Sequence, residues 1–195
     1  MNREEFLNKQ PEENIYNDIH ALHKLLFSEF KKQFDRSLPF PDEVFDRWER
    51  AKKLGWGEGS SVYDSSYIFG NVQMGKKCWV GPYSIIDGSG GLTIGDNCTI
   101  SAGVHIYSHD NLKQTLSGGQ LPIEHAPVSI GDCTYIGPQS IITKGITIGH
   151  HCVIASNSFV SKSVEDYTIV GGNPAKKIGR IIIRNNDIEF DYNLK

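Results

Sequence analysis

The chain has 195 residues, of which 38% are hydrophobic and 22% are charged, and its formal net charge is −3. These proportions are those of a globular protein and exclude a disordered chain. The lack of a basic surface argues against nucleic-acid binding and against adhesion to an anionic membrane. Because the start shows no signal-peptide pattern and no apolar run is long enough to span a bilayer, we expect a cytoplasmic protein.

The first 56 residues carry an α-helical pattern. Apolar residues recur every three or four positions from Ile15 to Phe34, which predicts an amphipathic helix. The pattern breaks at Pro39, and Asp42 is then the expected N-cap of a second helix that ends at Gly55. We expect this segment to cap the domain that follows, to shape a binding pocket and subunit contacts, or to do both.

From Ile68 onward the sequence repeats every six residues. An aliphatic residue leads each unit, and the lead residues are Ile68, Met74, Val80, Ile86, Ile94, Ile100, Ile106, Ile130, Ile136, Ile142, Ile148, Ile154 and Val160. A period of six fits neither a helix nor an ordinary strand, but it fits a solenoid in which each unit forms one short side and one turn. We predict that the lead residues stack in buried rows.

The residue four positions after each lead residue is small or aliphatic, as in Cys78, Ser84 and Ser140, which predicts a narrow interior. Glycines directly after lead residues, such as Gly137, mark turns where a Cβ atom would be strained.

Two segments interrupt the repeat. The first, Asp87–Gly91, adds two residues to one turn. The second runs from Ser108 to about Pro127, after which the repeat resumes in phase, and this pattern predicts a loop carried by a rigid scaffold. After residue 178 the sequence changes character again, and we expect a short strand or a packing arm.

The register resembles the hexapeptide-repeat family of acyltransferases, in particular the branch that acetylates sugars and antibiotics. The segment Ile130–Pro138 and the ending Gly172–Lys176 carry the resemblance, which covers residues 62–178. It implies a mainly β fold, a left-handed parallel β-helix with an N-terminal α-helical cap and a protruding loop. The left hand rests on the resemblance alone, because parallel crossovers are normally right-handed.

The expected organisation is therefore a helical segment (1–56), a β-helix acyltransferase domain (57–178, with its loop at 108–127) and a C-terminal tail (179–195). The resemblance implies transfer of an acetyl group from acetyl-CoA to a hydroxyl or amine of a sugar, in a surface polysaccharide or linked to a nucleotide. It also implies a homotrimer with active sites between neighbouring subunits. The resemblance leaves open an antibiotic as the acceptor.

Acyl transfer to a hydroxyl or amine needs a base, and histidine, with a reference pKa near 6.5, suits this role. Of the chain's seven histidines, only His109 lies where the repeat gives way to the long loop. The resemblance places the catalytic histidine at this junction. Its second ring nitrogen needs an acceptor group, for which Asp87, Asp110 and a backbone carbonyl are candidates. Asp87, in an irregular turn, is our first choice.

The remaining site residues divide between acceptor and donor. For the acceptor we expect Ser84, Asp110, Asn111 and His125. The resemblance and the positive charges together suggest, for acetyl-CoA, Tyr135, Pro138, Ser156, Ser161, Lys162, Lys177 and Arg180. Tyr135 and Pro138 depart from the family pattern, which more often has Trp and a small residue at these positions. We expect no metal site.

Two other functions are compatible with a β-helix. A zinc hydratase of the γ-carbonic anhydrase type needs three histidines facing one subunit groove. His105 and His109 are close in sequence, but no histidine precedes them at the spacing that this enzyme requires. A scaffold that only binds partners would have no use for the His109 junction.

Overall fold

The computed structural model describes residues 10–185 and 187–193. These residues fall into two compact units, which divide between Asp46 and Arg47. The first unit holds helices α2 (Glu13–Phe34) and α3 (Phe40–Val44), and the second begins with helix α4 (Arg47–Lys53). Among the described residues, no helix combines the length and the apolar character needed to cross a bilayer.

Helix α2 follows the apolar period of the sequence, although none of its side chains is buried. The prediction of one second helix with Asp42 as its N-cap is wrong. Pro39 is the N-cap of α3, and Asp42 lies inside that helix. A proline at the start of a helix loses no hydrogen bond, because the first N–H groups of a helix have no intrahelical partner. Helix α3 can therefore begin directly after Pro39. Phe45, with extended backbone, then ends α3 before α4 starts.

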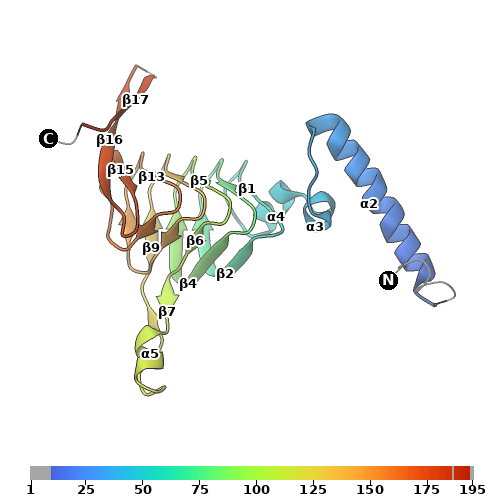
Figure 1. Ribbon diagram of the computed structural model, residues 1–195, viewed down its shortest axis with the longest axis horizontal. Helices are drawn as coiled ribbons and strands as arrows, with labels where there is room; N and C mark the ends of the chain where they lie inside the picture. The colour runs from blue at the N-terminus through green and yellow to red at the C-terminus, as the bar shows by residue number, and fades with distance from the viewer. Residues whose placement is uncertain (1–9, 186, 194–195) are drawn as a thin grey trace. The chain divides into compact units, whose positions relative to one another are not determined.

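The second unit is a left-handed parallel β-helix, as predicted, and its stacked coils are visible in Figure 1. Its coil strands are β1 (Ser61–Val62), β2 (Tyr67–Met74), β3 (Trp79–Val80), β4 (Ile85–Ile94), β5 (Thr99–Ile100), β6 (His105–Ile106), β9 (Val128–Ile130), β10 (Tyr135–Ile136), β11 (Ile141–Ile142), β12 (Thr147–Ile148), β13 (Val153–Ile154), β14 (Phe159–Val160) and β15 (Thr168–Gly171). Most of these strands have two residues because a turn follows each short side.

Strand register shows how the repeat builds the coils. Tyr135 pairs with Val153, so one regular coil spans 18 residues, or three hexapeptides. The segment at Asp87–Gly91 lengthens one coil to 20 residues; it lies inside the continuous strand β4, whose pairing with β2 shifts there, and not in a turn. The coils also resume in phase after the long interruption, because Thr99, before it, pairs with Tyr135, after it.

The core consists of the rows that the sequence predicts. All the lead residues from Met74 to Val160 are buried, and Ile86, Ile100 and Ile142 are fully inaccessible. The small polar residues of the interior bond the backbone of the next coil. Ser140 Oγ donates to the Ala155 carbonyl at 2.9 Å and accepts a hydrogen bond from Ser158 N at 3.3 Å. Because the interior is narrow, these buried hydroxyls find hydrogen-bond partners in the neighbouring coil.

Turn glycines in this fold permit close approach between coils. A Cβ atom on Gly137 would lie 2.6 Å from Ser156 N and 2.8 Å from the Ile154 carbonyl oxygen, both in the next coil. The left-handed conformation falls two residues later, where Gln139 has a φ of 60°. The glycine is therefore required by stacking, and the strained φ angle is carried by another residue.

Helix α4 covers the first coil. Ala51 of this helix and Trp56 after it are buried in the same core cluster as Val62 and Met74. Trp56 Nε1 donates to the Val72 carbonyl at 3.2 Å. Arg50 donates to the Ser66 carbonyl at 2.8 Å, so this end of the solenoid is closed by side chains and not left open to other strands.

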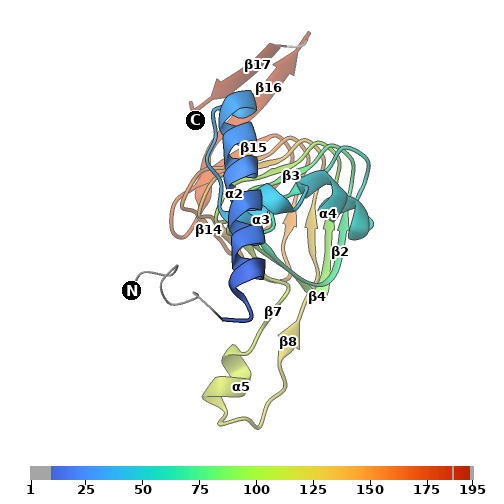
Figure 2. The same cartoon turned by 90° about the vertical axis from the view of Figure 1, so that its right-hand side faces the viewer.

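Two segments project from the coils (Figure 1). The arm, residues 108–127, contains strands β7 (His109–Asp110) and β8 (Glu124–His125), with helix α5 (Leu112–Leu116) between them. Figure 2 shows β7 and β8 side by side where the arm joins the coils. At the C-terminal end, β16 (Lys176–Arg184) pairs antiparallel with β15 and with β17 (Asp187–Asp191). The tail is therefore a hairpin.

Candidate functional site

The base of the arm brings His109 and Asp87 together. His109 is the first residue of β7, and its Nδ1 atom lies 2.6 Å from Oδ2 of Asp87 in β4. The carboxylate is buried, with 1% of its side chain exposed, whereas the imidazole is 37% exposed. The Nδ1 edge of the ring is thus bonded to a buried carboxylate, while another part of the ring remains accessible to a ligand.

Four further hydrogen bonds surround the Asp87 carboxylate. Ser89 donates its N–H and its hydroxyl to Oδ1, at 3.0 and 2.5 Å. Ser108 donates its N–H and its hydroxyl to Oδ2, at 2.9 and 3.3 Å. Burial by itself raises the pKa of Asp87, but the bonds from Ser89, Ser108 and His109 outweigh it and hold the pKa at about 2. Asp87 is therefore ionised at neutral pH.

The ionised carboxylate determines which ring nitrogen of a neutral His109 carries the proton. A carboxylate can only accept hydrogen bonds, so Nδ1 must be the donor in the 2.6 Å contact. Nε2 of the neutral ring then has a free lone pair. The arrangement can remove a proton from a hydroxyl or amine placed next to Nε2.

Glycine in β4 allows the arm to start this close to Asp87. A Cβ atom on Gly90 would lie 2.2 Å from the Ser108 carbonyl oxygen. Gly90 N also donates to Ser108 Oγ at 2.7 Å, and Ala126 N closes the arm by donating to the Ser108 carbonyl at 2.9 Å. The added residues in β4 and the neck of the arm therefore form one packed structure.

His125 lies directly beside His109. The two residues are partners in the antiparallel pairing of β7 and β8, and their rings stack with centroids 5.6 Å apart at an angle of 22°. His125 is exposed. The structure thus brings this predicted acceptor residue to the accessible side of the candidate base.

Asp110, the other carboxylate considered as a partner for the His109 ring, bonds different groups. Its carboxylate bonds Lys144 Nζ and, at 3.1 Å, the backbone N–H of Leu112. Glu124, its partner across the arm, bonds Lys144 at 3.1 Å and Lys113 at 2.6 Å. Asp87, and not Asp110, therefore holds the imidazole.

Two further predicted acceptor residues lie apart from the ring of His109. The prediction for Ser84 is wrong, because its side chain is fully buried inside the β-helix. Its hydroxyl donates to the carbonyls of Gly81 and Ser101, at 3.0 and 3.2 Å. Asn111 is exposed at the start of α5, one residue beyond the paired part of the arm.

The predicted donor residues run toward the C-terminal end of the β-helix. Tyr135 is exposed on β10, and Pro138 and Ser156 occupy stacked corners of successive coils, where Asn157 N donates to the Pro138 carbonyl at 2.8 Å. Ser161 and Lys162 are exposed directly after β14. Figure 1 shows these coils on the C-terminal side of the arm.

A pocket of about 380 Å³ lies among the last coil and the start of β16. Val160, Val164 and Val170 form its apolar part, and Lys162, Lys176 and Lys177 contribute positive charge. Arg180 does not line this pocket; its Nε atom lies 3.0 Å from Oδ2 of Asp191 in the C-terminal hairpin. The three lysines outnumber the one carboxylate of the lining, that of Glu165, and this balance of charge suits a ligand that carries phosphate groups.

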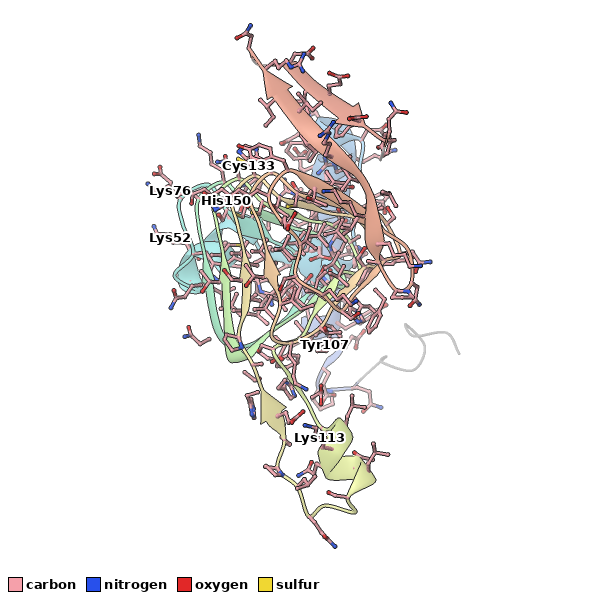
Figure 3. The ribbon with its side chains drawn as sticks, turned by 90° about the vertical axis from the view of Figure 1, so that its left-hand side faces the viewer. Lys52, Lys76, Tyr107, Lys113, Cys133 and His150 are labelled. Carbon is pink, nitrogen blue, oxygen red and sulfur yellow. The ribbon has the colours of Figure 1, made fainter. Side chains whose placement is uncertain are left out.

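Several residues of this site were not predicted. Ser89 follows Asp87 by two positions, a spacing at which an aspartate accepts a backbone N–H, and this signal was available in the sequence. Tyr107 lies where the arm leaves the coils (Figure 3), and its hydroxyl is 3.2 Å from His105 Nδ1. Burial raises the pKa of Tyr107, and the charge of Asp87 adds to the effect.

Comparison with known proteins identifies two matching families. Residues 72–108 match the hexapeptide repeat of succinyl-transferase, and residues 127–162 match the bacterial transferase hexapeptide of six repeats. The chain is 57% identical over 49 residues to a chloramphenicol acetyltransferase of Klebsiella aerogenes, a match that covers 25% of this chain and 23% of the relative. The chain therefore spans about a quarter of the length of that relative.

Longer matches cover most of the coils. A chloramphenicol acetyltransferase of Agrobacterium fabrum is 33% identical over 160 residues, covering 72% of this chain and 73% of the relative. The galactoside O-acetyltransferase of Escherichia coli is 29% identical, covering 80% and 79%. Among solved structures, a mutant of AntD, an N-acyltransferase from Bacillus cereus in complex with dTDP and coenzyme A, has a TM-score of 0.56 at 23% identity, covering 67% of this chain and 87% of that one. This last likeness concerns the fold.

Proposed function

The chain belongs to the hexapeptide-repeat transferase family, and we propose that it transfers an acetyl group from acetyl-CoA to a hydroxyl or amine. The observation that carries the proposal is the pair of Asp87 and His109, a buried carboxylate bonded to the Nδ1 of an accessible imidazole. We expect the reaction in the cytoplasm, where acetyl-CoA supplies the acyl group.

His109 serves as the general base in this proposal. Its Nε2 takes the proton from the acceptor hydroxyl or amine as the acceptor oxygen or nitrogen bonds to the thioester carbonyl carbon. When the carbon–sulfur bond breaks, the imidazolium returns that proton to the sulfur, so coenzyme A leaves as the free thiol. Asp87 keeps the ring in one orientation and stabilises its positive charge between the two proton transfers.

The donor is expected along the C-terminal coils. Lys162 and Lys177 at the 380 Å³ pocket are suited to the phosphates of coenzyme A, and Tyr135, Pro138, Ser156 and Ser161 to its pantetheine arm. Arg180 shares its charge with Asp191, so we expect a smaller part for it. The thioester must reach Nε2 of His109, and a neighbouring subunit would supply the second wall of such a groove.

We propose a homotrimer for this reason. The triangular β-helix has flat sides, and three copies packed in parallel would place one His109 in each groove between neighbours. The 37% exposure of the His109 side chain in a single chain leaves it accessible from such a groove.

A sugar is the acceptor that we favour. The galactoside O-acetyltransferase match extends over 80% of this chain, and the AntD complex contains dTDP, the nucleoside diphosphate part of a dTDP-linked sugar. His125, which stacks on His109, and Asn111, further along the arm, are both exposed and can donate or accept hydrogen bonds with sugar hydroxyls. The sugar of a surface polysaccharide and a nucleotide-linked sugar both present such groups.

A chloramphenicol-like antibiotic is the second candidate. Its support is the higher identity of the chloramphenicol acetyltransferases, 57% over 49 residues and 33% over 160 residues. Both candidates require a hydroxyl or amine near His109, so the site geometry alone serves either one.

An acceptor screen with acetyl-CoA tests the proposal by measuring free thiol release. Galactosides, dTDP-linked amino sugars and chloramphenicol form the panel, and the His109→Ala variant is the control. We expect thiol release that depends on the acceptor and is lost in the variant. Failure of every hydroxyl and amine acceptor, or equal release by the variant, would refute the proposal.

A further inference from the structure

Lys144 contacts both strands of the arm at once. Its Nζ atom bonds Oδ2 of Asp110 in β7 and lies 3.1 Å from Oε2 of Glu124 in β8. The exposed fractions of the three side chains are 21%, 31% and 34%, so each member of the group is partly exposed.

The two carboxylates would repel one another without this lysine. Asp110 and Glu124 are direct partners in the antiparallel pair, one position from the partners His109 and His125. Like charges directly opposite each other destabilise such a pair. The contact with Lys144 lowers the pKa of Asp110, and contacts with Lys113 and Lys144 lower the pKa of Glu124. The ammonium group thus compensates a repulsion at the position next to the base.

The lysine belongs to the β-helix and not to the arm. It follows β11, and β11 pairs with β6, the strand from which the chain enters the arm. Next to it, Gly145 N donates to the Ala126 carbonyl at 3.2 Å, where the arm returns. Lys144 therefore joins the projecting two-stranded arm to a turn of the β-helix.

We propose that Lys144 is a positioning residue that holds β7 and β8 together against the β-helix and so keeps His109 over Asp87 and beside His125. The effect on catalysis rests on the proposed acyl transfer. The effect on the arm itself is independent of any activity.

Hydrogen exchange of the full chain tests the positioning directly. In Lys144→Met, amides of residues 109–125 should exchange at least about tenfold faster, and those of β10 to β14 should be unchanged. Lys144→Arg keeps the charge and should keep the protection. Lys113→Met is the matched control, because Lys113 bonds the same Glu124 from within the arm, on α5 (Figure 3), and is 63% exposed. It should change exchange by less than about twofold.

A charge-neutralising rescue separates repulsion from lost packing. Lys144→Met combined with Glu124→Gln leaves one carboxylate in the pair and should restore most of the protection of the arm. The proposal is overturned if Lys144→Met exchanges like the wild type, if Lys113→Met loosens the arm equally, or if the combined variant stays as loose as Lys144→Met.

Steady-state kinetics test the catalytic consequence. Lys144→Met should lower kcat/KM for the acceptor by about tenfold and leave the KM for acetyl-CoA within about twofold, because the arm borders the acceptor side of His109. Unchanged acceptor kinetics in a variant with a loosened arm would overturn the catalytic part. A wild-type protein without acyl transfer would instead refute the proposed function, while hydrogen exchange would still decide the role of Lys144.

Discussion

His109 and Asp87 are 22 positions apart in the chain, yet His109 Nδ1 lies 2.6 Å from Asp87 Oδ2. The stacking of β4 on β6 produces this contact, because Ile86 pairs with Ile106, so that Asp87, the next residue of β4, lies beside the segment that leaves β6 for the arm. Two irregular segments of the repeat therefore meet at one point.

Replacing His109 tests the base. His109→Ala should lower kcat by roughly 10²- to 10⁴-fold and leave the affinity for acetyl-CoA nearly unchanged, since the base acts in the transition state and not in donor binding. His109→Asn, which cannot take the proton, should not rescue activity. Thiol-release kinetics and calorimetric titration with acetyl-CoA measure the two effects. A variant that keeps more than about a tenth of the wild-type kcat would contradict the assignment.

Replacing Asp87 tests the orientation of the ring. In Asp87→Asn an amide N–H₂ group takes the place of one of the two oxygens, both of which accept N–H and O–H groups from Ser89, Ser108 and His109. We expect kcat to fall by roughly 10²-fold or more, because Nδ1 no longer has a charged acceptor. Ser89→Ala removes one hydroxyl donor but keeps the carboxylate, and should cost less. Equal losses in the two variants would argue against ring orientation as the cause.

Asp87 also predicts how stability depends on pH. Folding lowers its pKa from 3.8 to about 2, so its stabilising contribution is complete above pH 4 and is lost as the pH falls toward 2. The stability gap between wild type and Asp87→Asn should therefore shrink across this window, by about 2 kcal/mol. Urea unfolding at several pH values measures the gap. A gap that stays constant between pH 4 and 2 would show that the carboxylate is not stabilised in this way.

Charge reversal tests the donor pocket. Acetyl-CoA at a hundredfold excess over Kd should stabilise the wild type by about 2.7 kcal/mol, seen as a higher Tm. Lys162→Glu should reduce this shift, because Lys162 lines the pocket at the last coil. Lys52→Glu is the control, since Lys52 is exposed on α4, which lies at the opposite end of the β-helix from β15 (Figure 1). Equal Tm shifts in the two variants would place the donor elsewhere.

The oligomeric state is open to direct measurement. Size-exclusion chromatography with light scattering should give three times the mass of one chain. A stable and fully active monomer would contradict the proposed homotrimer.

Much of the fold could be predicted because the repeat is local. The row from Met74 to Val160 follows from a six-residue period, since each unit repeats the same side and the same turn. His109 could be singled out because it lies where this period stops. The helix from Glu13 to Phe34 likewise follows from the spacing of its apolar residues.

The sequence by itself thus determined the coils and the junction where His109 stands, because stacking repeats one short pattern. The tertiary structure decided which groups meet there. Asp87 rather than Asp110 holds His109, and Lys144 reaches Asp110 from 34 positions away, because the course of the arm and the register of the coils set these contacts. Ser84 was mispredicted as an acceptor contact although its place in the repeat, four positions after Val80, already indicated the interior, where its side chain is indeed fully buried.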